Sequence, residues 1–432
     1  MEEELKEILA AALAAAEPER VVRRFLSIED GRMSIGGESF EPRRVLTLVI
    51  GKASGAMARA AGEVLGEALN GGLCIIKAGH EEPPPTFETL VASHPEPDEK
   101  SARAAKKVEE FLKDLEEGDL LLVLVSGGAS ALLADTAPGI TLEDLKQLNS
   151  ALLRSGAEIG EINAVRKHVS TLKGGGLVRR AAPARVAALL LSDVVGDDPS
   201  SIGSGLTAPD PTTLEDVWGI LERYEIEPPQ SVQDHLDKEH ETPKPGDAVF
   251  EKLTNIIVGS GRLTAAAAAK KASELGYESF LLSTYLTGDA REMAGFHAAV
   301  VKEILESGNP LPPPCALVTG GEATIVVRGA GIGGPNQEFA LALALKLEGI
   351  QAWAALAVDT DGTDGPTDAA GGLVTGETAA VIRENGVDPY KALDENDSWE
   401  ALRAGEALVS TGPTGTNVND LRVMLVSDST HQ

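Results

Sequence analysis

The sequence has 432 residues, of which 43% are hydrophobic but only 3% aromatic, so its cores must be built mainly from Ala, Val, Leu and Ile. Its formal net charge is −29, from 67 acidic and 38 basic residues. This charge argues against nucleic acid or an anionic membrane as a partner, because binding a polyanion needs a basic face.

No apolar run reaches the ~18 residues that a membrane-spanning helix requires, and the acidic start MEEELKEILAAAL is unlike a signal peptide. Cys74 and Cys315 lie in apolar, strand-like runs, so we interpret both as buried thiols in a reducing compartment. We expect a soluble, cytoplasmic protein. The length favours two domains, and the proline-rich stretch 228–245 predicts their boundary, with domains at 1–240 and 241–432.

In the first half, apolar runs bounded by glycine alternate with helical patterns at the spacing of βα units. We expect strands at residues 45–50, 73–77, 89–93, 120–125 and 185–191, and helices at residues 2–15, 54–69, 98–115, 141–154 and 161–172. This alternation predicts a mostly parallel, doubly wound sheet. Such sheets bind ligands at the carboxyl ends of their strands.

The second half also consists of strands, glycine turns and helices, which predicts a second α/β domain. We expect strands at residues 253–258, 279–284, 316–319, 324–328, 353–358 and 421–426, and helices at residues 289–305 and after the glycine turns at 259–261 and 331–334.

The segment 119–133, DLLLVLVSGGASALL, organises the first half. Its apolar run stops at Ser126-Gly127-Gly128, and a helix is expected to open at Ala129. A strand that passes through Gly-Gly into a helix leaves backbone N–H groups unpaired, and such turns bind anions. In the alternative interpretation the glycines only allow a tight connection with positive φ.

Gly51-Lys52 follows a strand at the same type of sheet edge, where the lysine ammonium could meet a phosphate. The motif is not a Walker A loop, because GxxxxGK[ST] is absent from the sequence. The alternative is an ordinary surface lysine.

A cationic cluster lies in NAVRKHVSTLKGGG, and it comprises Arg166, Lys167, His168 and Lys173. Helical spacing would put Arg166 and Lys173 on one face, which favours anion binding. The alternative is ordinary pairing with carboxylates, and a lone histidine such as His168 is more often structural than catalytic.

Two loops that follow buried strands are rich in aspartate and glycine. Their acids are Asp193, Asp197 and Asp198 in the first loop, and Asp359, Asp361, Asp364 and Asp368 in the second. Carboxylates at strand ends suit Mg²⁺ and can act as a general base. The alternative is a solvated turn, since Asp-Gly is ordinary turn chemistry, and DTDGTDGPTD fails the EF-hand pattern.

Glycine turns, a few cations and Mg²⁺-type carboxylates together indicate phosphoryl transfer, which depends on positioning and charge neutralisation. A nicotinamide site would need GxGxxG, but Gly259-Ser260-Gly261 lacks the third glycine. No GxSxG motif is present.

The motifs GKASGAM, SHPEPD, LVSGGASALL, EINAVRKHVSTLKGGGL, LLSDVVGDDPSSIGSGLTAPDPTT, GGPNQEFALA and DGTDGPTDAAGG occur in matching order from about residue 20 onward. In this the sequence resembles the glycerate 2-kinase family with a MOFRL domain. The resemblance implies two three-layer α/β/α domains, the first with a doubly wound, mostly parallel Rossmann-like sheet and the second, the MOFRL domain, with a mixed sheet. It implies phosphorylation of D-glycerate to 2-phosphoglycerate with ATP and Mg²⁺, in a cleft between the domains.

The resemblance also carries residue roles. Lys52 matches a lysine regarded as essential in the family, and the SGGAS turn matches a proposed ligand loop. Many relatives carry an arginine before Asn-Gln-Glu, where this chain has Pro335, so Arg328 or Arg262 is expected to replace it beside Asn336.

We therefore predict that Lys52 and the segment Ser126–Ser130, with Gly127 and Gly128, hold anionic oxygens. The other predicted ligand-binding residues are Arg166, Lys173, Arg328 and Asn336, and the predicted metal ligands are Asp193, Asp198, Asp361 and Asp364. Asp193 is expected to accept the hydroxyl proton or to hold Mg²⁺. The alternatives are a hydroxypyruvate reductase that uses NAD(P)H and a non-catalytic sugar-acid or nucleotide-binding protein, and a homodimer stays open.

Overall fold

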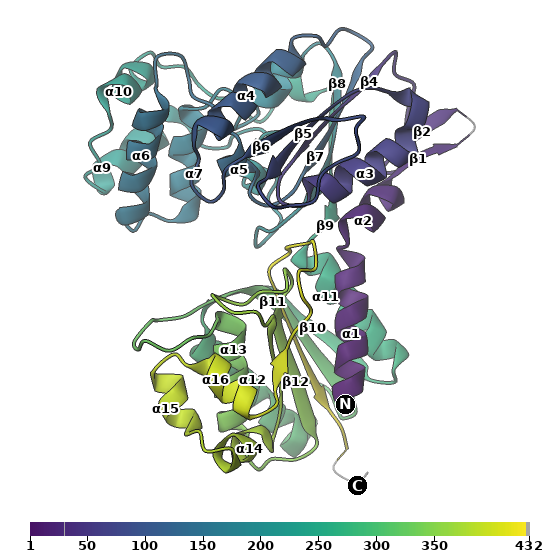
Figure 1. Ribbon diagram of the computed structural model, residues 1–432, viewed down its shortest axis with the longest axis vertical. Helices are drawn as coiled ribbons and strands as arrows, with labels where there is room; N and C mark the ends of the chain where they lie inside the picture. The colour runs from purple at the N-terminus through teal and green to yellow at the C-terminus, as the bar shows by residue number, and fades with distance from the viewer. Residues whose placement is uncertain (30, 429–432) are drawn as a thin grey trace. The chain divides into compact units, whose positions relative to one another are not determined.

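The structure is a computed structural model and describes residues 1–29 and 31–428. The chain forms two compact units (Figure 1). We call residues 18–258 the parallel-sheet unit, and residues 1–17 together with 259–432 the mixed-sheet unit. Within the described ranges, no helix has both the length and the apolar character needed to cross a membrane.

The main sheet of the parallel-sheet unit has the strand order β6-β5-β4-β7-β8-β9. Its strands are β4 (Val45–Ile50), β5 (Leu69–Lys77), β6 (Glu88–Ala92), β7 (Leu120–Val125), β8 (Arg185–Leu191) and β9 (Leu253–Gly259). The pairs β4–β5, β5–β6, β4–β7 and β7–β8 are parallel. The strand order runs outward in both directions from the β4–β7 pair, so the sheet is doubly wound, as expected.

Helices cover both faces of this sheet (Figure 1). The helices of the unit are α2 (Pro18–Phe25), α3 (Ser54–Leu65), α4 (Glu99–Leu112), α5 (Ala129–Leu132), α6 (Leu142–Arg154), α7 (Ile159–His168), α8 (Gly176–Ala181), α9 (Leu214–Arg223) and α10 (Gln230–Leu236). Every residue of β4 and β7 is buried, because α3 packs on one face while α4, α5 and α8 pack on the other.

Two further parts complete the unit. Helices α6, α7, α9 and α10 form a lobe with a core of its own. A small antiparallel sheet consists of β1 (Leu26–Glu29), β2 (Arg32–Ile35) and β3 (Glu38–Phe40).

Three helices of this unit begin at a residue whose side chain caps the helix. The side chains of Asp98, Thr141 and Thr213 accept backbone N–H groups at the starts of α4, α6 and α9.

The sheet of the mixed-sheet unit has the order β10-β11-β15-β12-β13-β14. Its strands are β10 (Glu278–Asp289), β11 (Cys315–Thr324), β12 (Trp353–Asp359), β13 (Gly371–Thr375), β14 (Leu408–Val409) and β15 (Asp420–Val426). The β10–β11 pair is parallel and the other pairs are antiparallel. The expected mixed sheet is therefore confirmed.

Alternate residues of these strands face different helices. The helices are α1 (Glu2–Ala15), α11 (Gly261–Glu274), α12 (Ala290–Ser307), α13 (Pro335–Lys346), α14 (Thr378–Glu384), α15 (Pro389–Asp394) and α16 (Ser398–Ala404). Leu317 and Ala355 pack with α12 and α13, whereas Val318 and Leu356 pack with α1 and α11. A period of two places one residue set on each face, which gives the expected three layers.

The division of the chain differs from the expected boundary at residues 240 and 241. Strand β9 forms the edge of the parallel sheet, where Val186 N–H donates to the Lys252 carbonyl (3.0 Å). Helix α1 instead packs in the mixed-sheet unit, where Leu5 and Ile8 share a core with Ala268. An amphipathic helix or a short apolar strand carries no local signal for which sheet it joins.

Two strands were expected, at residues 316–319 and 324–328, but there is one, β11, which continues through both glycines to Thr324, and residues 325–328 form no strand. Gly320 and Gly321 do not turn the chain, because both stay paired with β15. A Cβ on Gly321, whose φ is +129°, would lie 1.9 Å from the Leu286 carbonyl oxygen of β10. Glycine here permits a close approach between strands rather than a turn.

Both cysteines are buried in strands, Cys74 in β5 and Cys315 in β11. Burial raises the pKa of the Cys74 thiol to about 12 and that of Cys315 to about 11. Since the thiolate is the reactive form, neither cysteine is a nucleophile at neutral pH.

Candidate active site

The turns after β4 and β7 lie side by side at the point where the strand order reverses. Lys52 N–H donates to the Gly127 carbonyl (2.9 Å), and Ala53 N–H donates to Ser126 Oγ (3.0 Å). A Cβ on Gly51, whose φ is +132°, would lie 2.2 Å from that Oγ. Doubly wound sheets bind ligands at this reversal, so two of the predicted motifs meet where a site is expected.

The Ser126 hydroxyl is buried and holds the two turns together. Helix α5 is only one short turn, from Ala129 to Leu132, rather than the longer helix expected there. The backbone N–H groups of Gly128 and Ala129 donate to no group within the described residues. Ser130 Oγ lies 2.9 Å from Ser204 Oγ. The turn thus keeps free amide donors, which an anion could accept.

Lys52 and Asp193 converge on the Gly127-Gly128 turn. A Cβ on Gly127 would lie 2.2 Å from Oδ2 of Asp193, which follows β8. A Cβ on Gly128 would lie 3.3 Å from Cγ of Lys52. Burial raises the pKa of the Asp193 carboxyl, while the Lys52 charge works in the opposite direction. The Lys52 ammonium makes no hydrogen bond or ion pair with any described residue.

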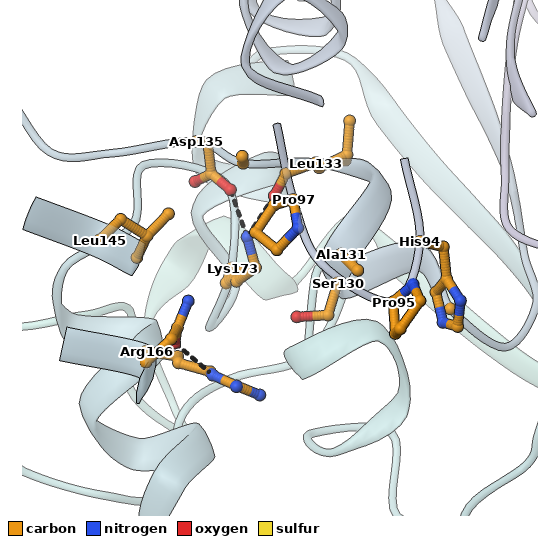
Figure 2. Close-up of a pocket in the computed structure, with 13 residues that line it drawn as sticks. His94, Pro95, Pro97, Ser130, Ala131, Leu133, Asp135, Leu145, Arg166 and Lys173 are labelled. Atoms are coloured by element: carbon orange, nitrogen blue, oxygen red, sulfur yellow. Dashed lines mark hydrogen bonds and ion pairs between the residues drawn. The ribbon is translucent and has the colours of Figure 1, made fainter. Parts of the chain in front are cut away.

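A pocket of about 250 Å³ opens beside this turn (Figure 2). Gly128, Ser130, Arg166 and Lys173 are among its lining residues. Lys52 and Asp193 do not line it, but Lys52 adjoins it at Gly128. The pocket is large enough for a molecule of a few carbon atoms.

Arg166 is the unpaired cation of this pocket. It is half-buried on α7, and its Nε donates to Oδ1 of Asn149 on α6 (2.8 Å). No carboxylate among the described residues pairs with it. Burial lowers the pKa of Arg166, which shows the cost of leaving this charge without a counter-ion. In a chain of charge −29, an arginine held this way indicates an anionic ligand.

The rest of the cationic cluster is paired. Lys173 Nζ forms an ion pair with Asp135 (2.5 Å) and donates to the Leu133 carbonyl (2.7 Å). Lys167 pairs with Asp210 (3.3 Å). Helix α7 ends at His168, so Arg166 and Lys173 do not share a helix face, although both line the pocket. For Lys167 and Lys173 the ordinary alternative, pairing with carboxylates, is what the structure has.

His168 is also a structural residue. Its ring lies within 3.6 Å of Asp210 and 3.2 Å of Glu241, and Nδ1 lies 2.9 Å from the Ala164 carbonyl. The histidine is buried and connects α7 to the segment before α9 and to the segment after α10. It is not among the residues that line the pocket.

Of the aspartates predicted in this unit as magnesium ligands, Asp193 accepts no hydrogen bond from another described residue. Asp198 instead accepts from Ser200 N–H (2.9 Å), Ser200 Oγ (2.6 Å) and Ser201 Oγ (3.3 Å), so it shapes its own loop. The described residues contain no group of three or more His, Cys, Asp or Glu side chains arranged to hold a metal. Magnesium often binds through one or two carboxylates plus phosphate oxygens, and Asp193 fits that pattern.

In the mixed-sheet unit, Asp364 caps helix α13. Its carboxylate accepts the N–H groups of Asn336 (3.1 Å) and Gln337 (2.8 Å), and Asn336 Nδ2 donates to both Asp364 (3.2 Å) and Asp420 (2.7 Å). Burial raises the pKa of Asp364 to about 6, and the Asp420 charge adds to the shift. The structure places Asp364 and Asn336 in contacts at the start of a helix, and the metal and phosphate roles predicted for them stay predictions.

The remaining candidates of this unit lie in loops or on the surface. Asp361 accepts from Thr363 N–H and Oγ1 (both 2.8 Å). Burial, with the Asp361 charge adding to it, raises the pKa of Asp359 to about 8. Arg328 and Arg262 are exposed. Pro335 begins α13, where a proline needs no N–H partner. Nothing in these local contacts assigns a ligand to the two arginines.

Among the polar residues that line the pocket, sequence reasoning missed His94, Asp135 and Asn149. His94 lies in the SHPEPD motif, whose composition alone indicates only a turn. Asn149 lies within the helical pattern of α6, and nothing in the neighbouring sequence marks it as a site residue. Their proximity to Gly128 and Arg166 depends on tertiary packing, so no local pattern could have revealed it.

Fold and site together define a doubly wound α/β protein whose strand-order reversal carries unpaired cations and free amide donors. Residues 4–237 match a family described as a domain of unknown function, DUF4147, and residues 315–420 match the MOFRL family. The D-glycerate 2-kinase of Thermotoga maritima is 43% identical over 97% of this chain and 97% of its own. The chain therefore belongs to the glycerate kinase family with a MOFRL domain, which confirms the resemblance.

Other relatives also match this chain over nearly its full length. The glycerate 2-kinase of Pyrococcus horikoshii is 40% identical over 97% of this chain and 96% of its own. A protein of Agrobacterium vitis with the provisional name of hydroxypyruvate reductase is 41% identical over 98% of this chain and 94% of its own. The crystal structure of the Thermotoga maritima glycerate kinase matches with a TM-score of 0.90 and 42% identity, covering 98% of this chain and 99% of that one.

Proposed function

We propose that this chain is a glycerate 2-kinase that transfers the γ-phosphoryl group of ATP to the 2-hydroxyl group of D-glycerate. The observation that carries the proposal is the convergence of Lys52, Asp193 and the unpaired Arg166 on one glycine turn and its pocket. Full-length relatives that bear this name support it.

Each residue has a role that its chemistry suits. The planar guanidinium of Arg166 can bind the carboxylate of glycerate with two parallel hydrogen bonds. The free ammonium of Lys52 and the amides of Gly128 and Ala129 can neutralise phosphoryl oxygens, where negative charge is spread in the transition state. The backbone of the turn that carries the two amides is held by hydrogen bonds between the turns after β4 and β7.

In the transfer, the hydroxyl oxygen forms a bond to the γ-phosphorus while the bond to the bridging oxygen breaks, and ADP leaves with that electron pair. Asp193 either accepts the hydroxyl proton or holds magnesium. Burial raises the pKa of its carboxyl group above the ordinary value, which makes the carboxylate a stronger base. Magnesium, when bound with ATP, supplies neutralisation of the phosphate charge. A supply of ATP is consistent with the expected cytoplasmic location.

The test is a coupled ADP-release assay with a panel of hydroxy acids, in which NMR identifies the phosphorylated position. We expect ADP release with D-glycerate and a product phosphorylated at the 2-hydroxyl. The proposal fails if D-glycerate gives no ADP above the background hydrolysis of ATP. Oxidation of NADH or NADPH with hydroxypyruvate, measured in parallel, would instead establish the reductase.

A further inference from the structure

His94 lines the pocket and has no part in the mechanism described so far. It follows strand β6, and its imidazole edge lies against the glycine turn. A Cβ on Gly128 would lie 3.0 Å from Cδ2 and 3.1 Å from Nε2 of His94. In Figure 2, Ser130 lies between His94 and Arg166. His94 and the unpaired arginine therefore line the same small pocket.

Both ring nitrogens of His94 are free to bind a ligand. Neither makes a hydrogen bond with any described residue. The contrast with other histidines is clear, since His80 Nδ1 lies 2.9 Å from the Lys52 carbonyl and His297 contacts Met293 and Thr319. A half-buried imidazole without partners is costly unless water or a ligand bonds to it.

The charges around His94 determine which ligand group it suits. Burial lowers its pKa to about 4, and the charges of Lys52, Lys77 and His80 add to the shift. The ring is therefore neutral at pH 7, with one donor and one acceptor nitrogen. A carboxylate or phosphate would pair better with Arg166 or Lys52. A neutral ring that can donate and accept is instead complementary to a hydroxyl group.

We propose that His94 is a specificity-determining residue that forms a hydrogen bond with a hydroxyl group of the acid bound by Arg166. The inference rests on the proposed function in taking that acid to be glycerate. The pocket would then select hydroxy acids over plain carboxylic acids. A site built to bond a hydroxyl rejects an analogue without it, because its own polar group is left unpaired.

The test compares D-glycerate with propionate, which has the same carboxylate and carbon chain but no hydroxyl. Calorimetry measures binding of both acids, in the presence of ADP, to the wild type, His94→Leu and His94→Gln. In His94→Leu we expect D-glycerate affinity to fall about tenfold, while propionate affinity changes less than about twofold. His94→Gln, which keeps a donor and an acceptor, should fall between the two proteins.

The control is His240→Leu, since His240 is exposed and outside the pocket; its affinities should equal those of the wild type. Equal losses for both acids in His94→Leu, no loss for either, or no binding of D-glycerate to the wild type would each overturn the inference. Thermal unfolding verifies that the variants fold, and His94→Gln serves if the leucine variant does not.

The outcome for the proposed function is separate. A wild type that binds D-glycerate but releases no ADP refutes the kinase, whereas the role of His94 is still judged by binding alone. A wild type that releases ADP, with an unaltered preference for D-glycerate in His94→Leu, refutes only the role of His94.

Discussion

The carboxylate of Asp193 lies against the backbone of Gly127, so closely that a Cβ on the glycine would be 2.2 Å from Oδ2 and 2.9 Å from Cγ. No other amino acid fits at residue 127 without moving the acid. The φ of Gly127 is not positive, so close approach, and not backbone freedom, is what requires glycine there.

Gly127→Ala should therefore displace Asp193 and lower kcat by about 100-fold or more, since misplacement of a reacting group by about 1 Å can cost that much. The matched control is Gly160→Ala in α7, where a Cβ would meet nothing within 4 Å. That change should leave kcat intact and raise the free energy of unfolding by about 0.5–1 kcal/mol. Steady-state kinetics and urea unfolding measure both effects, and equal activity in the two variants would contradict the close-approach argument.

Asp193→Asn separates the two roles of this acid. We expect kcat to fall by about 100-fold or more through loss of the proton acceptor, and excess magnesium should not restore it. The measurement is kcat as a function of magnesium concentration. If millimolar magnesium brings the variant back to wild-type turnover, Asp193 is a metal ligand instead.

Lys52→Ala should lower kcat by about 100-fold to 1000-fold, because the ammonium stabilises charge that develops on the phosphoryl group. Lys146→Ala is the control, since Lys146 is exposed on α6. Circular dichroism and thermal unfolding should show both variants folded. Near wild-type turnover in Lys52→Ala would remove this lysine from the chemistry.

Arg166→Met should raise KM for D-glycerate about tenfold or more, while the protein without ligand stays as stable or becomes more stable. The reason is that Arg166 is a half-buried charge without a carboxylate partner, and methionine spares its desolvation. Kinetics and urea unfolding in the absence of ligand test the two parts. A marked loss of stability with unchanged KM would show that Arg166 serves the fold and not the substrate.

His297 should make the mixed-sheet unit sensitive to acid. It is fully buried, and burial together with the Arg422 charge lowers its pKa to about 4. The unfolded chain takes up this proton near pH 6.5, so the contribution is present above that pH and is lost as the pH falls toward about 4. We expect a loss of about 3 kcal/mol of unfolding free energy over this interval, measured by urea titration. His297→Gln should flatten the dependence, and an equal slope in both proteins would assign the acid sensitivity to other groups.

Local sequence was sufficient for the strands that carry the site. Strands β4, β7 and β8 begin and end at the expected residues, because each is a mainly apolar run that starts at or just after a charged residue and stops at a glycine or serine. The glycine turns after β4 and β7 were predicted for the same reason. Parallel order then brings them to one sheet edge.

Whether each cation is paired with a carboxylate could not be predicted, because the partner is distant in sequence. Asp135 precedes Lys173 by 38 residues, and Asp210 follows Lys167 by 43. A sequence pattern cannot distinguish these paired lysines from Arg166, which has only Asn149 beside it. The same applies to His94, which is a candidate ligand-binding residue only because the fold brings it next to Gly128.

The packing of α1 against α11 has a consequence for biosynthesis. Helix α1 is synthesised before the other elements of its core, which include β12 and β15, and the whole parallel-sheet unit lies between them in the chain. Residues 18–258 can be synthesised and fold before α1 has its packing partners, so the apolar face of α1 is exposed to solvent during that time. Nascent chains stalled before β15 should therefore bind chaperones at α1, and removal of residues 1–17 should destabilise the mixed-sheet unit more than the parallel-sheet unit.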